Sequence, residues 1–133
     1  MESSEAEPPR EQKGAARVKQ TVPSESYEQE RLVIWLEANE YKFTAIPHGM
    51  FTRSYAVKAR NTREGVRAGF PDIVICLKRK PLLFAVEMKR ITGGRVSAEQ
   101  NEWIKALNQR GVRALVCNGF EEARAAIERG ERE

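Results

Sequence analysis

The sequence is poor in cysteine and histidine, and this scarcity excludes several kinds of site. Its two cysteines, Cys76 and Cys117, both lie in apolar runs without CxxC or Cys/His spacing. This pattern predicts two small buried thiols in a reducing compartment rather than a disulfide, and it argues against a zinc site. With His48 as the only histidine, an HNH-type or HD-type nuclease site is not available. GxSxG and P-loop spacings are also absent from the sequence.

Long hydrophobic runs are missing as well. No apolar run approaches the length of a membrane span, and the first residues lack the pattern of a signal peptide. We therefore expect a soluble, cytoplasmic protein. Residues 1–23 hold almost no large apolar side chains, so they cannot bury enough surface to offset the entropy of ordering. We expect them to form a disordered tail, with residues 24–133 forming one domain.

Charge of both signs is plentiful, with a small basic excess. The 133 residues carry a formal net charge of +4, and the sequence pI is about 9.3. The predicted tail has equal numbers of acidic and basic residues, so the excess belongs to the folded part. This balance favours a polyanionic partner such as a nucleic acid, without establishing one.

The apolar pattern predicts an α/β domain. Ser24 is a plausible N-cap for a first helix, and Ser97 to Gln100 fits a capping box that opens another helix, which Gly111 ends. A last helix is expected over residues 120–129. The connection over residues 47–70 is long and basic, and part of it can be helical. The expected strands are residues 43–46, 73–77, 82–88 and 112–117.

The two central strands form a predicted hairpin with residues 78–81 as its loop. Leu77 then faces Leu82, and Asp72 falls directly opposite Glu87. Both faces are apolar for most of their length, which predicts strands covered on both sides. One face carries Asp72, Val74, Cys76, Leu83, Ala85, Glu87 and Lys89. The other face carries Ile73, Ile75, Leu77, Leu82, Phe84, Val86 and Met88.

Two opposed carboxylates at one rim of a sheet repel each other. The chain can relieve this by protonating one acid, by pairing the acids with Lys89, or by binding a hard divalent cation such as Mg²⁺. A metal there could polarise a phosphodiester and activate water, while Lys89 orients that water or offsets charge on the phosphate. A structural Asp72–Lys89–Glu87 cluster is the alternative, and these residues alone leave both interpretations open.

The motif PD, followed fifteen positions after Asp72 by Glu87-Met88-Lys89, resembles the PD-(D/E)xK nuclease superfamily. The surrounding stretches VRAGFPDIVIC, FAVEMKR and GGRVSAEQNEWIKALNQRGVRALVCNGFEEARAAI resemble its VRR-NUC branch, the virus-type replication-repair nucleases. The similarity covers residues 24–129. It implies a restriction-endonuclease-like αβββαβ core, with a mixed central sheet flanked by helices.

The resemblance also implies roles for individual residues. Asp72, Glu87 and the main-chain carbonyl of Met88 would hold Mg²⁺ or Mn²⁺, and Lys89 would be the catalytic lysine. Gln100 matches a family glutamine beside the active site. The capping box offers a purely structural explanation of the same residue.

The first helix contributes a further acid in this family. The stretch ESYEQ resembles the family's E-x-x-x-Q start, which indicates Glu25 as a metal ligand with Gln29 as its companion. Glu28 lies one turn on and remains an alternative, and acids at this helix end are also common without any catalytic role. The family often shows P-N-G after the first strand, where this chain has Pro47-His48-Gly49. His48 is interpreted as a loop residue.

Basic residues precede and follow the proposed metal site in the sequence. Contacts from such side chains to phosphates would give salt-sensitive affinity with little sequence preference. The cluster at residues 78–80 is interpreted as a solvated turn at the opposite end of the strands. The predicted nucleic-acid-binding residues are Arg53, Lys58, Arg60, Arg63, Arg67, Arg90 and Arg95.

Taken together, the residues and the resemblance predict a Mg²⁺-dependent endodeoxyribonuclease that selects DNA structure, such as a branch or junction, rather than sequence. A homodimer would suit the two scissile strands of a junction. The resemblance places such an enzyme in DNA repair or replication, in a bacterial or phage-infected cell. The alternatives are a catalytically inactive nucleic-acid-binding module of the same fold and a protein-interaction domain.

Overall fold

The computed structural model describes residues 21–47 and 54–133, so most of the predicted tail, His48 and Arg53 lie outside the described residues. The helices and strands follow the expected order, and one further helix lies in the long basic connection. They are α2 (Glu25–Ala38), β1 (Lys42–Ala45), α3 (Tyr55–Arg63), β2 (Ile73–Cys76), β3 (Leu83–Lys89), α4 (Ala98–Gln109), β4 (Arg113–Asn118) and α5 (Phe120–Arg132).

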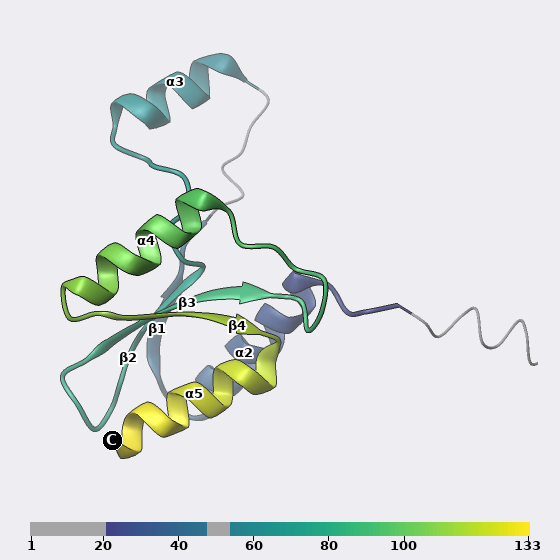
Figure 1. Ribbon diagram of the computed structural model, residues 1–133, viewed down its shortest axis with the longest axis vertical. Helices are drawn as coiled ribbons and strands as arrows, with labels where there is room; N and C mark the ends of the chain where they lie inside the picture. The colour runs from purple at the N-terminus through teal and green to yellow at the C-terminus, as the bar shows by residue number, and fades with distance from the viewer. Residues whose placement is uncertain (1–20, 48–53) are drawn as a thin grey trace, which may run out of the picture.

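The four strands form one mixed sheet in the order β1-β2-β3-β4. The β1–β2 and β2–β3 pairs are antiparallel, whereas β4 lies parallel to β3. Helix α4 lies on one face of the sheet, and α2 and α5 lie on the other (Figure 1). The predicted architecture, a mixed central sheet flanked by helices, is therefore confirmed.

The helix starts follow the predicted capping residues. The Oγ of Ser24 accepts a hydrogen bond from the Tyr27 amide at 3.0 Å, so Ser24 caps α2. Ser97 and Gln100 form the complete capping box of α4, with both reciprocal hydrogen bonds present. Such caps satisfy amides that would otherwise have no partner in the first turn of a helix.

The hairpin has the predicted register. Ile73 pairs with Val86 and Cys76 pairs with Leu83. The two residue numbers in each pair have the same sum as in the predicted pairs Leu77–Leu82 and Asp72–Glu87, so the register is the same. The ladder ends at Ile73. One residue beyond it, the amide of Asp72 donates to the Val86 carbonyl at 3.0 Å. Asp72 therefore lies at the end of the hairpin where β3 finishes.

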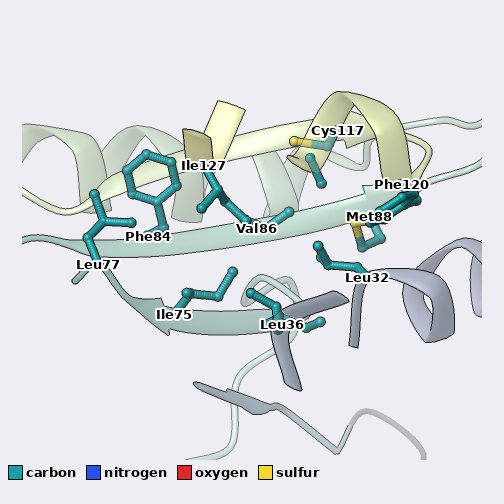
Figure 2. Packing of buried hydrophobic residues seen from close by; sticks show 12 residues of the cluster. Leu32, Leu36, Ile75, Leu77, Phe84, Val86, Met88, Cys117, Phe120 and Ile127 are labelled. Atoms are coloured by element: carbon teal, nitrogen blue, oxygen red, sulfur yellow. The ribbon is translucent and has the colours of Figure 1, made fainter. Parts of the chain in front are cut away.

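The hydrophobic core lies between the sheet and the α2/α5 layer (Figure 2). The face of the hairpin that carries Ile75, Phe84, Val86 and Met88 packs against Leu32 and Leu36 of α2 and Ile127 of α5, all fully buried. Each such side chain contributes roughly 1.5–3 kcal/mol when it leaves water. This packing holds α2 and α5 against the two strands that carry the predicted catalytic residues.

The opposite face is covered only in part. Ala85, Glu87 and Lys89 are buried there, whereas Cys76 and Leu83 are exposed. The prediction that both faces are covered is therefore wrong at this end of the hairpin, and so is the prediction of a buried thiol at Cys76. The reason is that α4 packs against β4, at one side of the sheet. Cys117 is buried as predicted.

The hairpin turn is held by the last helix. A carboxylate of α5, Glu131, accepts hydrogen bonds from the amides of Lys78 and Arg79, each at 2.8 Å. The same carboxylate accepts a hydrogen bond from the Tyr41 hydroxyl at 2.8 Å. The main chain of the turn is thus docked onto α5, while the side chains of Lys78 and Arg79 remain exposed as expected.

Candidate active site

A buried carboxylate and a buried ammonium lie side by side at the end of β3. Glu87 is 2% exposed and Lys89 is 6% exposed. Residues two apart on a strand point to the same face, and Nζ of Lys89 lies 3.4 Å from Oε2 of Glu87. The first turn of α2 approaches the same point, because Oε2 of Glu25 lies 3.9 Å from Lys89 Nζ. The structure therefore brings together three of the predicted catalytic residues.

Asp72 acts on this group electrostatically. Its Oδ2 accepts a hydrogen bond from the Met88 amide at 2.7 Å, which fixes the carboxylate at the end of β3. Burial raises the pKa of Glu87 to about 8, the negative charge of Asp72 adds to the rise, and Lys89 partly offsets it. The negative charge of Asp72 and a hydrogen bond between the two carboxyl groups thus both favour the protonated form of Glu87.

Gln100 combines the two roles that its sequence position left open. Its Oε1 accepts a hydrogen bond from the Ser97 amide at 2.9 Å, which completes the capping box of α4. Its Nε2 donates to Oε2 of Glu87 at 2.8 Å. Because the oxygen of the side-chain amide is held by the helix cap, the NH₂ group is directed at the carboxylate. The cap of α4 therefore orients a side chain that contacts Glu87, the predicted catalytic acid.

The donor set fits a hard divalent cation. Oε2 of Glu87 accepts the hydrogen bond from Gln100 and forms an ion pair with Lys89. In contrast, its Oε1 is buried and has no hydrogen-bond partner among the described residues. A buried acceptor without a partner is costly, and a cation beside Asp72 would satisfy it. Over residues 21–47 and 54–133, no cluster of three or more His, Cys, Asp or Glu side chains could hold a metal ion. Main-chain oxygen, water and substrate would have to complete the shell.

The two acids of the first helix have different surroundings. Glu25 is exposed at the rim beside Lys89. Glu28 is 1% exposed, and its Oε1 accepts a hydrogen bond from the Phe120 amide at 2.8 Å. Phe120 opens α5, whose N-cap Gly119 has no side chain to cap the helix. Glu28 thus places a negative charge at the N-terminus of α5, a favourable position for an anion.

No local sequence pattern predicts this contact between Glu28 and the Phe120 amide. The signal in the sequence was indirect: a glycine precedes α5, and an acid stands on the core-facing stripe of α2. Their partnership spans 92 positions of the chain, so no local pattern reveals it.

The predicted nucleic-acid-binding residues are spread over two regions. Lys58, Arg60 and Arg63 lie on α3, which has no buried residue. Arg90 and Arg95 are exposed between β3 and α4. Their exposure is compatible with phosphate contacts, and their role stays a prediction.

One predicted binding residue also has a local structural task. Nη1 of Arg67 donates to the carbonyls of Thr62 and Val66 at 3.0 and 3.1 Å, so it satisfies acceptors where α3 ends. A cation at the C-terminal end of a helix also interacts favourably with the helix dipole.

Comparison with solved structures identifies the class of fold. A chain described as a VRR_NUC domain protein matches with a TM-score of 0.67 and 22% sequence identity, covering 81% of this chain and 88% of that chain. The mixed sheet with flanking helices is therefore an α/β fold similar to that of a VRR_NUC domain protein. Comparison with curated proteins gives no match.

The chain belongs to the VRR-NUC family, because residues 10–121 match the VRR-NUC domain. The match confirms the resemblance that the PD…ExK motif and its surroundings indicated. It begins before residue 24, so the domain boundary expected there stays a prediction. In the part of the chain that the structure describes, no helix is long and apolar enough to cross a membrane.

Proposed function

We propose that this protein is a metal-dependent endonuclease that hydrolyses phosphodiester bonds in DNA. The observation that carries the proposal is the meeting of Asp72, Glu87 and Lys89 at one rim, where a buried oxygen of Glu87 has no hydrogen-bond partner among residues 21–47 and 54–133. Membership of the VRR-NUC family supports nuclease chemistry. The site, rather than the fold alone, supports this function.

The residues divide the work of hydrolysis. Asp72, Glu87 and the Met88 carbonyl would hold Mg²⁺ or Mn²⁺, with Glu25 contributing from α2. When bound, such a cation polarises the phosphodiester and lowers the pKa of a bound water. Lys89 orients the attacking water and offsets charge that develops on the phosphate. Gln100 holds the Glu87 carboxylate through its 2.8 Å hydrogen bond, so that Oε1 remains free for the cation.

We infer that the substrate is DNA recognised by its backbone and shape. The net charge of +4 and the exposed Arg and Lys side chains favour phosphate contacts, which carry little sequence information. Branched or junction DNA, as in repair and replication, suits such recognition, and a homodimer would suit the two symmetric strands of a junction. We also propose an intracellular setting, in a bacterial or phage-infected cell, for this nuclease.

A cleavage panel tests the proposal. Flap, splayed, junction and linear DNA are incubated with Mg²⁺ or Mn²⁺, using the wild type, Lys89→Ala and the exposed-lysine control Lys105→Ala. We expect the wild type and the control to cleave branched DNA, and Lys89→Ala to lose at least about 100-fold in rate. Equal and negligible cleavage by the wild type and Lys89→Ala would favour a binding module without catalysis. Failure to bind any DNA at any salt concentration would favour a protein-interaction domain.

A further inference from the structure

Helix α3 stands away from the rest of the domain. It spans Tyr55–Arg63, it has no buried residue, and Figure 1 shows it set apart from the sheet beyond α4. Isolated helices shorter than about 12–15 residues are marginally stable in water. Ser54 caps this helix by accepting a hydrogen bond from the Val57 amide at 3.3 Å, yet packing adds little. A helix of this length that lacks a packed face gains most from a partner outside the chain.

The charge of α3 indicates what kind of partner it fits. Within the helix, Lys58, Arg60 and Arg63 are all exposed, and the helix contains no acidic residue. Tyr55, at its first position, is 87% exposed. Arg60 and Arg63, three positions apart, share one side of the helix, and Lys58 lies on the other side, so positive charge surrounds the helix and complements a polyanion. A second copy of the same helix would bring like charges together, so self-association through α3 is disfavoured.

The segment that follows α3, residues 68–70, packs against the N-terminal half of α4. Nε1 of Trp103 donates to the Ala68 carbonyl at 3.0 Å, and the rings of Phe70 and Trp103 meet edge to face at 5.0 Å. Gly69 passes so close to α4 that an added Cβ would lie 2.7 Å from the carbonyl carbon of Glu99. Glu99 precedes Gln100, the residue that contacts Glu87. Residues 68–70, which follow α3 after a short connection, are therefore anchored on the first turns of α4, next to the proposed catalytic rim.

We propose that α3 is a DNA-holding arm: it grips the phosphate backbone of duplex DNA beside the bond to be cleaved, through Lys58, Arg60 and Arg63. The inference rests on the proposed function, because it concerns the substrate of the same site. It assigns α3 to binding and substrate choice, and the buried rim to the chemistry. Contact with DNA also supplies a packing partner that this short helix does not find among the described residues.

The test measures DNA binding without cleavage. Lys58→Ala, Arg60→Ala and Arg63→Ala are combined, since alanine keeps the helix and removes three charges. The matched control combines Lys42→Ala, Lys105→Ala and Arg110→Ala, three exposed residues outside α3. Binding of a labelled four-way junction and a labelled duplex is followed by fluorescence anisotropy in EDTA over a range of salt concentrations.

We expect the arm variant to bind at least about tenfold more weakly than the control at low salt. Its plot of log affinity against log salt should be less steep than that of the wild type by about 3, because three phosphate contacts are lost. Hydrogen exchange of the amides in residues 55–63 should slow when DNA is added to the wild type. Circular dichroism checks that both variants are folded.

Several outcomes would overturn the inference. Equal loss of affinity in the arm variant and the control would show only a general charge effect. Unchanged exchange in residues 55–63 on DNA binding, or a change of oligomeric state instead of affinity in the arm variant, would assign α3 to another task. Because these titrations contain EDTA, they do not depend on cleavage. A wild type that binds DNA through α3 but cleaves none of the substrates would contradict the proposed catalysis without contradicting the proposed DNA-holding arm.

Discussion

Gln100 and Glu87 are joined by a hydrogen bond of 2.8 Å that links the N-terminus of α4 to the end of β3. The other end of the Gln100 amide accepts a hydrogen bond from the Ser97 amide. Because the oxygen and the nitrogen of the Gln100 amide are both already hydrogen-bonded, this side chain loses little conformational entropy when substrate binds. One side chain therefore serves both the cap of α4 and the proposed active site.

Replacing this amide by a carboxylate should slow cleavage with little loss of folding. In Gln100→Glu the oxygen that accepts from Ser97 is retained, while the donor to Glu87 becomes an acceptor and, when ionised, a like charge. We expect the single-turnover rate on saturating branched DNA to fall at least about tenfold. Gln109→Glu, on the exposed end of the same helix, is the control and should leave the rate unchanged. Equal rates for both variants would show that the contact with Glu87 is only structural.

The raised pKa of Glu87 predicts that metal-free protein loses stability in mild alkali. An unfolded glutamate has a pKa of about 4.5, and the folded value is about 8. Between these values the folded state holds a proton that the unfolded state has released. Unfolding therefore becomes easier as pH rises through this window, by up to about 1.4 kcal/mol per pH unit from this group. Below pH 4.5 this contribution is fully present, and above pH 8 it is lost.

Urea denaturation in EDTA from pH 5 to pH 9 measures this dependence. Glu87→Gln has no proton to lose, so its free energy of unfolding should be flatter over the same window, and the difference from the wild type isolates the group. Metal binding must displace the same proton, so Mg²⁺ affinity of the wild type should increase as pH rises toward 8. Parallel stability curves for the wild type and the variant would contradict the prediction.

We expect Glu25 to contribute to catalysis and Glu28 to contribute to folding stability. Removing the buried carboxylate in Glu28→Ala deletes the hydrogen bond to the Phe120 amide and leaves a small cavity, so we expect a loss of about 2 kcal/mol. Glu25→Ala, at the exposed rim, should cost far less stability and should lower the cleavage rate. Urea midpoints and single-turnover rates of both variants decide the question. A stable Glu28→Ala protein without cleavage would instead make Glu28 the acid of the site.

Substitutions of two glycines that follow α3 test how this part of the chain is attached to α4. Gly65 and Gly69 both have positive φ, +102° and +97°, where other residues are strained by roughly 1–3 kcal/mol. Around Gly65 an added Cβ meets nothing within 4 Å, whereas at Gly69 it collides with the main chain of Glu99. We expect Gly69→Ala to destabilise by about 1–3 kcal/mol more than Gly65→Ala, since α4 must shift. Thermal unfolding of both variants measures the difference, and equal costs would show that the close approach to α4 is unimportant.

The hairpin that carries the site could be predicted because local rules determine it. Once residues 78–81 form the turn, the antiparallel register follows, and strand alternation then places Glu87 and Lys89 on one face. The motif and its surroundings pointed to the family, and the capping box marked the start of α4. These features depend on residues close together in the chain or on a pattern that recurs across a family.

The remaining features depend on contacts between distant residues. Cys76 is exposed because of where α4 packs across the sheet, which no pattern within β2 reveals. Glu28 caps a helix that begins 92 positions later, and Glu131 holds a turn that lies 53 positions before it. Sequence periodicity identifies the buried stripe of a helix but not the group that each polar member of the stripe will meet.

The separation of α3 from the core has a consequence for how this domain can change over time. Because no residue of α3 is buried, its side chains can be exchanged without disturbing the packing of Phe84, Leu32 or Ile127. On the proposal that α3 holds DNA, mutations in it that alter which DNA shapes are engaged need not endanger either folding or the proposed reaction centre. The proposed arm could then change its DNA preference while the proposed hydrolysis is retained, and grafting a foreign helix between Ser54 and Gly65 is a direct way to test this.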